Sequence, residues 1–491
     1  MRLKIFLANL LPTLILTVLG FAVMGYHPGA EDDGVYLTAV KADLRPTLFP
    51  HDSDFFRLQL QATQFDSWMA HFVHITGLSI AWSELIWQFI GLFLILWACR
   101  SIAEHLFSGK AAQWGAVAMV AAMFTLPVAG TALYLVDQHL HPRNLATALT
   151  MLAISRILAG KRWQALPLLL LSIVLHPIMG ALGISFCVIL ALTAMEPAPV
   201  AMRVARHTVA SVMPLGWVFE PPSAAWRQAL NTRTYFYLSR WTWYEWLGAI
   251  APSILFFLLW RIAARRADTR LSRFALAVFS FAVFQQIVAF VVLGPPSFVR
   301  LMPFQPMRFL QLVYVFLCLV GGAFLGKYLL KKKIWRWAVF LVIANGGMFF
   351  AQRQLFAGTT HIEMPNSPTS NIWLQAFEWI RVNTPEDAYF AMDPNYMAAP
   401  GEDYHSFRAL AERSQLADNI KDTSVATQVP SLAPIWQEQQ TAMAGWSHFQ
   451  LSDFERLKIQ FGVNWVIVSY PPPSSMPCPW HNGSLSVCRI P

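Results

Sequence analysis

The stretch FLANLLPTLILTVLGFAVMGYHPGAEDDG, residues 6–34, contains the two features that decide the fold. Its first part, from Phe6 to Tyr26, is apolar and long enough to cross a bilayer. Three adjacent carboxylates follow it: Glu31, Asp32 and Asp33. Carboxylates are costly to place in lipid, so these three must face water or a protein cavity. The stretch therefore predicts a membrane span that leads directly into an acidic loop.

The composition of the whole chain agrees with this prediction. The 491 residues are 56% hydrophobic and only 13% charged, with a mean hydropathy of +0.44, which is too apolar for a soluble protein of this size. The apolar residues come in segments of spanning length, so we expect an α-helical polytopic membrane protein. The net charge of +9 does not indicate a nucleic-acid partner, because Lys and Arg cluster in short loops between the spans.

The apolar segments and basic loops predict a topology with about 10–11 transmembrane helices. The predicted spans are 6–26, 82–106, 111–136, 143–159, 163–178, 179–195, 245–264, 272–293, 308–330 and 334–351, with a short eleventh crossing at His207–Phe219. The basic loops are Ser108–Lys110, Gly160–Arg162, Arg265–Arg273 and Lys327–Lys333. The positive-inside rule places these loops and the N-terminus in the cytoplasm, so residues 27–80 and those after 352 fall outside. We expect the first segment to be retained as a span, because no small-residue cleavage site follows it; the alternative is a signal peptide that is removed.

The chain divides into two predicted domains. Residues 1–352 form the transmembrane domain, which includes the extracytoplasmic loop 27–80, and residues 360–491 form a soluble extracytoplasmic α/β domain. In the second domain, helical spacing at Asn371–Val382 is followed by a strand pattern at Ala388–Met392. Cys478 and Cys488 near the C-terminus are candidates for a disulfide, which an extracytoplasmic location permits.

The acidic residues of loop 27–80 are the main candidates for catalytic and metal-binding roles. A sugar or lipid hydroxyl that attacks an anomeric carbon must lose its proton, and a positioned Asp such as Asp32 or Asp33 is a common general base. A divalent ion, Mg²⁺ or Mn²⁺, held by one of these acids with Asp52 or Asp54 would instead stabilise a departing phosphate. The structural alternative is that Asp32 or Asp33 caps the helix beginning near Val35. Because two adjacent acids exceed what one cap needs, we expect one to cap while its neighbour acts.

The rest of this loop is amphipathic. Apolar residues between Phe55 and Ile75 recur at spacings of three, four and seven. Such a pattern predicts a helix that lies in the membrane interface with its apolar face down.

Outer turns between the spans supply cations for a departing phosphate. His141 and Arg143 lie in the turn before the span at 143, and Arg300 and Arg308 flank the turn after residue 293. Arginine contacts phosphate in a bidentate manner, which makes these residues candidates for substrate binding. The alternative for Arg300 and Arg308 is snorkelling at the ends of spans.

These features together resemble the GT-C superfamily of integral membrane glycosyltransferases. The resemblance rests on an N-terminal span, a first outer loop with an acidic motif (Glu31-Asp32-Asp33), many further spans and an extracytoplasmic C-terminal domain. In that superfamily the acid of the first outer loop is catalytic and the donor is usually a polyprenyl-phosphate sugar. The resemblance thus implies that Asp32 and Asp33 are catalytic. We also expect the adjacent Glu31 to contact the substrate. Residues 31–36, 49–52 and 379–385 also resemble a bacterial membrane family to which no defined activity attaches.

The sequence therefore predicts a glycosyltransferase of the inner membrane. It would transfer a sugar from a polyprenyl-phosphate donor, with membrane lipid and a saccharide, lipid or protein acceptor as its other partners. A transporter or flippase for a lipid-linked saccharide is the first alternative, with Gln285, Gln286 and His176 as its few polar candidates within the spans. A non-catalytic scaffold of cell-envelope assembly is the second.

Overall fold

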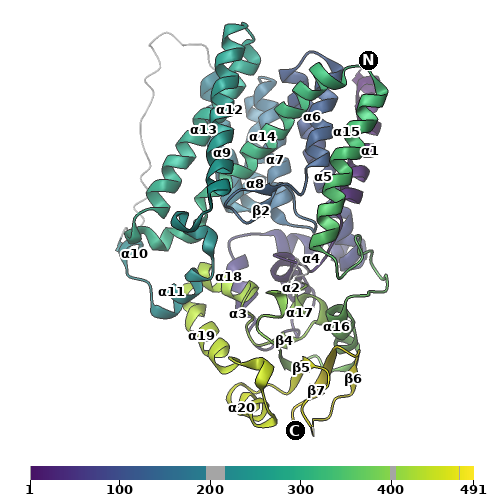
Figure 1. Ribbon diagram of the computed structural model, residues 1–491, viewed down its shortest axis with the longest axis vertical. Helices are drawn as coiled ribbons and strands as arrows, with labels where there is room; N and C mark the ends of the chain where they lie inside the picture. Colours follow the sequence, from purple (N-terminus) through teal and green to yellow (C-terminus); the bar gives the residue numbers. More distant parts are fainter. Residues whose placement is uncertain (1, 195–215, 399–404, 475) are drawn as a thin grey trace.

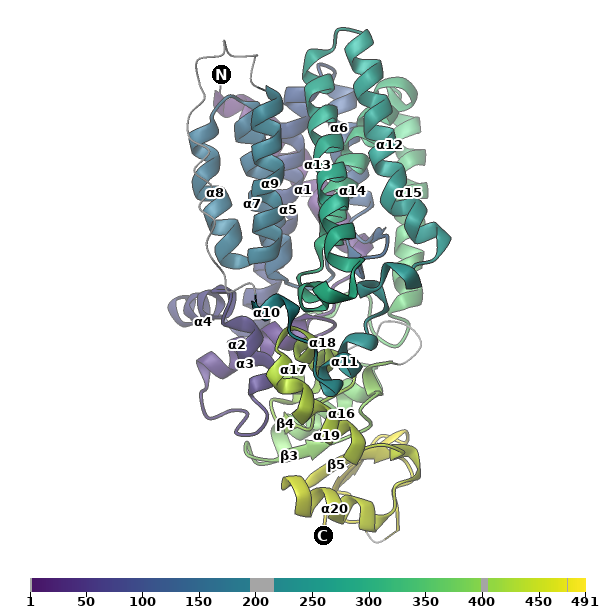
Figure 2. The same cartoon turned by 90° about the vertical axis from the view of Figure 1, so that its left-hand side faces the viewer.

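The computed structural model describes residues 2–194, 216–398, 405–474 and 476–491, which form two layers. One layer is a bundle of long helices, and the other contains the C-terminal sheet together with the helices of the first loop (Figure 1). The N-terminus and the connection between α12 and α13 lie at the end of the bundle that points away from the C-terminal layer (Figures 1 and 2).

The bundle confirms the predicted polytopic helical fold. Six helices are long and apolar enough to cross a membrane: α1 (Arg2–Met24), α5 (Ile80–Leu106), α12 (Trp243–Arg265), α13 (Thr269–Leu293), α14 (Phe309–Phe324) with its flanking turns η4 (Pro306–Arg308) and η5 (Leu325–Leu330), and α15 (Ile334–Leu355). Four shorter helices pack among them: α6 (Lys110–Ala122), α7 (Pro142–Leu158), α8 (Arg162–Leu175) and α9 (Pro177–Ala194). With 13, 17, 14 and 18 residues at 1.5 Å each, these helices are about 20 to 27 Å long, shorter than a hydrocarbon core of about 30 Å.

One predicted span is wrong in its second half. The segment 111–136 is helical only as far as Ala122, and a small hairpin follows, with strands β1 (Pro127–Val128) and β2 (Leu133–Tyr134). Pro127 cannot donate a helical hydrogen bond, and Gly130 turns the chain with a φ of +64°. A Cβ on Gly130 would lie 2.3 Å from the Trp241 ring, so only glycine fits there.

Of the predicted crossing at His207–Phe219, residues 207–215 lie outside the described residues. Gly216–Phe219 forms the short helix α10. The connection from α10 to α12 contains α11 (Ala224–Asn231), η1 (Thr234–Phe236) and η2 (Leu238–Arg240), and η3 (Pro296–Phe304) follows α13.

The first loop folds into three helices, α2 (Asp33–Leu44), α3 (Asp54–Leu60) and α4 (Phe65–Thr76). The single amphipathic helix expected from Phe55 to Ile75 is therefore split in two. The break is held by the end of α8, because the Thr63 hydroxyl donates to the Leu175 carbonyl at 2.7 Å and the Gln64 amide donates to the Val174 carbonyl at 3.2 Å. Helix α4 lies crosswise beside the bundle end (Figure 2), which is the placement expected of an interfacial helix.

The C-terminal layer is an α/β domain, as predicted. Its sheet has the order β4-β3-β5-β7-β6, in which β4, β3 and β5 are parallel and β7 and β6 are antiparallel to their neighbours. The strands are β3 (Tyr389–Ala391), β4 (Ser414–Gln415), β5 (Trp465–Ser469), β6 (Trp480–His481) and β7 (Leu485–Arg489). The helices are α16 (Ile372–Asn383), η6 (Tyr396–Ala398), α17 (Phe407–Ala411), α18 (Lys421–Gln428), η7 (Pro430–Leu432), α19 (Ala433–Ala442), η8 (Trp446–His448) and α20 (Leu451–Phe461).

Two cores cover the two faces of this sheet. Along β3 and β5, Phe390 and Ile467 face one core with Phe377 of α16, whereas Tyr389 and Val466 face the other with the apolar side of α20. This alternation follows from the two-residue period of a strand. The side chain of Asn371 starts α16 by accepting hydrogen bonds from two helix amides, which explains the helix predicted there.

A disulfide joins Cys478 to Cys488, the pair that the sequence suggested, and links β7 to the segment before β6. The two residues are ten positions apart, so a chain-entropy estimate gives a stabilisation of about 3 kcal/mol. We expect Cys488→Ser to lower the thermal unfolding midpoint of the full-length protein. A reducing agent should lower the wild-type midpoint to the same value and leave the variant unchanged; an equal response of both proteins would contradict this.

The first loop and the C-terminal domain pack directly on each other. Lys41 of α2 donates to the Glu412 carboxylate at 2.8 Å and to the Ala409 carbonyl at 2.7 Å. The backbone at Ala30 pairs with that at His405. These contacts hold the acidic turn between the bundle and the domain.

Candidate functional site

A cavity of about 370 Å³ lies where the bundle, the first loop and the C-terminal domain meet. Its walls come from segments that are far apart in the sequence. The lining residues that carry charge or titrate near neutral pH are Glu31, Asp32, His141, His176, Arg233, Arg300, Arg308 and Lys421. Aromatic side chains complete the walls, among them Tyr36, Trp226 and Tyr235. The mixture of cations, two carboxylates and aromatic faces suits a ligand with an anionic and a sugar-like part.

The turn before α2 separates the roles of the two adjacent aspartates. Asp33 is 1% exposed, and its Oδ2 accepts a hydrogen bond of 2.6 Å from the Gly29 amide, so this carboxylate faces its own turn. Asp32 lines the cavity, and 39% of its side-chain surface is exposed. Gly29 permits the turn because its φ is +77° and a Cβ would press on Leu410. The structure thus divides the predicted catalytic pair, with only Asp32 in a position to contact a ligand.

The two carboxyl groups also differ in acidity. Burial raises the pKa of Asp33 to about 7. Enclosure by protein would raise the pKa of Asp32 too, but the positive charge of Lys421, the N–H group of His141 and the charge of Arg143 outweigh this effect and hold the pKa well below its usual value. Asp32 is therefore ionised at neutral pH.

Lys421 at the start of α18 is the main partner of the acidic turn. Its ammonium group lies 2.6 Å from Glu31 Oε2 and 3.3 Å from Asp32 Oδ1. Burial alone would lower the pKa of Lys421, but Glu31 and Asp32 raise it above its ordinary value. The C-terminal domain thus places a permanent positive charge between two carboxylates of the first loop.

The turn that precedes α7 brings a histidine to the other oxygen of Asp32. His141 is the N-cap of α7, and its Nδ1 accepts the Arg143 amide at 2.9 Å. Burial and the nearby Arg143 lower the pKa of His141, so the ring is neutral and carries its proton on Nε2. That atom faces Asp32 Oδ2 at 3.6 Å. His141 therefore presents an N–H group toward the carboxylate and the cavity.

Arg143 is buried and does not line the cavity. Its Nη2 and Nε donate to Asp137 at 2.6 and 3.1 Å, which fixes the guanidinium group, and its Nη1 lies 4.0 Å from Asp32 Oδ2. The Nη1 atom has no hydrogen-bond partner. Arg143 thus acts on the cavity through Asp32.

Three further arginines line the cavity wall. Arg308 lies just before α14, and its Nε has no hydrogen-bond partner. Arg233 donates from Nη2 to the Ile420 carbonyl, and its Nε is likewise without a partner. Arg300 pairs with Glu220 at 3.1 Å and lies over the Trp226 ring. Buried N–H groups without acceptors are costly, so Arg233 and Arg308 are prepared for an anionic ligand.

The acids proposed as metal ligands lie elsewhere. Asp52 accepts hydrogen bonds from the Tyr389 hydroxyl and from Gln439 of the C-terminal domain, and Asp54 is exposed in the first turn of α3. Neither lines the cavity, because the α2–α3 connection turns toward the C-terminal domain. Among the described residues, no group of three potential metal ligands includes Asp32. The Lys421 ammonium lies between the carboxylates of Glu31 and Asp32, within ion-pair distance of both.

The sequence did not single out Lys421, Asp137 or Tyr36 as site residues. Lys421 follows Asp418 in a polar stretch of the C-terminal domain, and its partner Glu31 is 390 positions away. Asp137 belongs to the turn already marked by His141 and Arg143, so its ion pair with Arg143 could have been expected. Arg233 lies among aromatic residues such as Tyr235 and Tyr237, a pattern that by itself favours a belt at the membrane surface, but it lines the cavity.

The sequence matches no protein-family model, and no curated protein matches it. The chain is structurally similar to several solved chains, including the following two. The crystal structure of the Archaeoglobus fulgidus oligosaccharyltransferase in the apo form is 13% identical, with a TM-score of 0.47, over 93% of this chain and 69% of that chain. The archaeal oligosaccharyltransferase AglB from Archaeoglobus fulgidus, in complex with an inhibitory peptide and a dolichol-phosphate, is 13% identical, with a TM-score of 0.48, over 93% of this chain and 68% of that chain.

Proposed function

We propose that this chain is a membrane glycosyltransferase of the GT-C type, which moves a sugar from a polyprenyl-phosphate donor to a saccharide, lipid or protein acceptor. The observation that carries the proposal is the cavity that Asp32 shares with Arg233 and Arg308. The Asp32 carboxylate is ionised, and Arg233 and Arg308 each have an Nε–H group without a protein acceptor. A reaction that removes a proton and releases a phosphate needs these two kinds of group in one enclosed space.

In the proposed reaction the acceptor oxygen bonds to the anomeric carbon as the bond from that carbon to the phosphate oxygen breaks. The acceptor proton passes to Asp32, and the electron pair of the broken bond leaves with the lipid phosphate. Because the pKa of Asp32 is depressed, it is a weak base, so the proton moves late, once the acceptor oxygen has become acidic. Arg233 and Arg308 would hold the departing phosphate, and direct displacement inverts the anomeric configuration.

Lys421 takes over the role that a divalent cation would have at the acidic turn. It neutralises Glu31 and keeps Asp32 ionised, and its own pKa is raised, so its charge persists throughout the neutral range. Asp33 would contribute through its hydrogen bond with Gly29, which sets the direction in which Asp32 points. It is a positioning residue in this proposal.

The orientation of the bundle supports a reaction on the outer face. The last residue of α12, Arg265, and Arg266 in the connection to α13 lie at the end away from the C-terminal domain (Figure 1). By the positive-inside rule this end faces the cytoplasm. The cavity and the C-terminal domain would then lie on the outer side of the inner membrane.

The alternatives find less support in the residues. Gln285 donates to Ser185 at 3.0 Å, and Gln286 donates to the Ala249 carbonyl and to Ser253, so these polar groups are engaged within the bundle rather than exposed along a transport path. If the C-terminal domain were a separate scaffold, it would not be expected to line the cavity, but its Lys421 forms part of the cavity wall. The C-terminal domain belongs to the site.

Binding of a lipid phosphate tests the proposal before the sugar is known. We expect the full-length protein in detergent micelles to bind undecaprenyl phosphate, and Arg308→Gln to weaken binding roughly 10- to 100-fold, because one charge-assisted contact is lost. Native mass spectrometry measures the bound fraction. Arg270→Gln, at an exposed site in the first turn of α13, is the matched control and should bind normally. Equal affinity of the two variants would contradict a phosphate site beside Arg308.

A further inference from the structure

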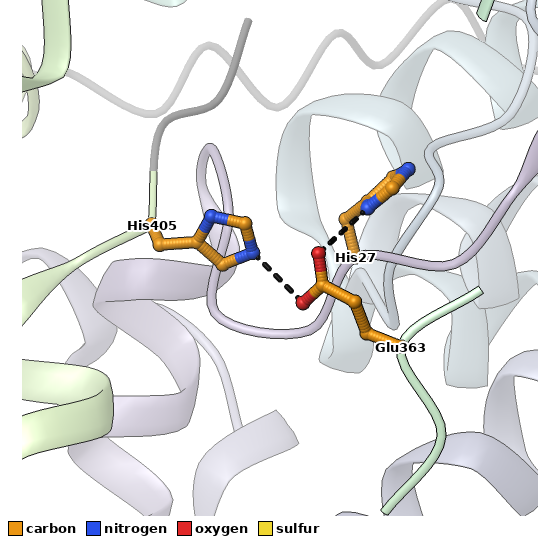
Figure 3. A group of neighbouring side chains, drawn as sticks. All are labelled: His27, Glu363 and His405. Atoms are coloured by element: carbon orange, nitrogen blue, oxygen red, sulfur yellow. Dashed lines mark hydrogen bonds and ion pairs between the residues drawn. The ribbon is translucent and has the colours of Figure 1, made fainter. Parts of the chain in front are cut away.

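A second cluster of titratable side chains lies outside the cavity. His27, Glu363 and His405 point toward one another, with one carboxylate oxygen facing each imidazole ring (Figure 3). His27 Nδ1 lies 3.0 Å from Glu363 Oε1, and His405 Nε2 lies 2.9 Å from Glu363 Oε2. The two histidine side chains are 0% and 1% exposed, and that of Glu363 is 13% exposed. Neither histidine nor Glu363 lines the proposed active site.

Three remote segments of the chain supply these residues. His27 follows α1, Glu363 lies in the linker after α15, and His405 precedes α17. The backbone holds the segments together next to the cluster, because Tyr26 pairs with Ile362 in a β-bridge and Ala30 pairs with His405 in another. The His27 ring also stacks on Phe356 at a centroid distance of 3.8 Å, which sets its plane. The three donors are therefore positioned by the fold rather than by one flexible loop.

We propose that His27, Glu363 and His405 form a structural binding site for a divalent transition-metal ion, with Zn²⁺ as the ion that fits best. Two imidazoles and one carboxylate are a ligand set that zinc accepts, with water completing the tetrahedron. Ligands at 2.0–2.1 Å around a tetrahedral ion stand about 3.3 Å apart. The two nitrogen–oxygen separations, 3.0 and 2.9 Å, are close to that value and each involves a different oxygen of Glu363. One ligand atom from each residue lies within 4.8 Å of the others, so the side chains would have to move closer together around the ion. Among the described residues this is the one such group.

The bound ion would crosslink three segments of the chain next to the acidic turn. His27 begins the turn that ends in Glu31 and Asp32, and His405 belongs to the domain that supplies Lys421. An ion held by all three ligands would fix the first loop, the linker and the C-terminal domain relative to one another. Because such an ion binds the folded state only, it would stabilise that state by mass action.

Metal analysis of the full-length protein tests this site without reference to catalysis. The protein is purified in detergent, its tag is removed, and bound metal is stripped with a chelator. We expect isothermal titration with ZnCl₂ to show one equivalent bound per chain, and excess zinc to raise the thermal unfolding midpoint. His405→Ala should weaken zinc binding by at least roughly 100-fold, because it removes a ligand. His448→Ala, at an exposed histidine of the same domain, is the matched control.

Glu363→Gln serves as a second variant in case His405→Ala does not fold. The amide can still form hydrogen bonds with both histidines but lacks the negative charge, so zinc binding should fall while the elution profile on size exclusion stays unchanged. Wild-type zinc binding that equals that of Glu363→Gln, or the absence of stoichiometric binding to the wild type, would overturn the proposal. Sugar transfer in the active site can succeed or fail independently of these measurements.

Discussion

Asp32→Asn is expected to reduce sugar transfer from a polyprenyl-phosphate donor about 10³-fold, within the range that a general base contributes. Asparagine preserves the size of the side chain but cannot accept the proton of the attacking hydroxyl. The measurement is the release of lipid phosphate from a panel of radiolabelled polyprenyl-phosphate sugars, with membranes that contain equal amounts of each protein. Binding of undecaprenyl phosphate should remain close to that of the wild type, because Arg233 and Arg308 are unchanged.

Two variants frame this result. Asp54→Asn changes an exposed acid of the same loop outside the cavity and should leave transfer unaffected. Asp33→Asn alters a buried carboxyl group that bonds to the Gly29 amide, so it should reduce transfer less than Asp32→Asn does. Wild-type rates for Asp32→Asn, or a larger loss for Asp33→Asn than for Asp32→Asn, would show that the two aspartates have been assigned incorrectly.

Lys421→Met is expected to shift the pH dependence of transfer toward higher pH. Lys421 is the strongest influence that lowers the pKa of Asp32, so its loss raises that pKa. Asp32 must be ionised to act, and activity is lost as the pH falls through its pKa. In the wild type this loss occurs far below neutrality, whereas in the variant it should occur at a higher pH. Methionine retains most of the side-chain length, so the wall of the cavity stays filled.

The control for this experiment is Lys458→Met, which removes an exposed lysine from the same domain. Its rate profile should follow that of the wild type from pH 4 to pH 9. Loss of the buried Lys421 charge also leaves Glu31 without its ion-pair partner, so Lys421→Met should unfold more readily as well. A profile of Lys421→Met that falls equally at all pH values, without a shift, would assign Lys421 a structural role only.

The helical part of the fold was predictable because its signals are local. Apart from 111–136, each of the ten predicted spans of full length formed a helix over most of its residues, and the apolar spacing at Asn371–Val382 predicted α16 within one or two residues. The incorrect prediction of one span over 111–136 also has a local cause. Residues 123–136 are apolar enough for lipid, but Pro127 and Gly130 turn them into a hairpin whose far end leads to His141. Hydropathy alone does not register such a turn.

The site was predictable only as a set of residue types. Glu31, Asp32, His141, Arg300 and Arg308, singled out from the sequence, all line one cavity, whereas Arg143 lies beside it and Asp52 and Asp54 lie away from it. Sequence reasoning expected one aspartate to cap the next helix and its neighbour to act, but neither side chain caps it. Asp32 is the N-cap of α2 without a capping hydrogen bond, and Asp33 bonds to the Gly29 amide before the helix. The Gly29 turn directs Asp33 to the backbone and leaves Asp32 in the cavity.

The order of hydrophobic and charged residues along the chain is sufficient to predict the membrane class, the succession of helices and the presence of an acidic loop. This is because the free-energy cost of placing a group in lipid depends on that group and its near neighbours. The pairing of Lys421 with Glu31, the division between Asp32 and Asp33, and the meeting of His27, Glu363 and His405 are properties of the folded chain. They depend on which distant segments pack together, and Coulomb interactions and metal coordination act over a few ångströms in space, whatever the separation in sequence.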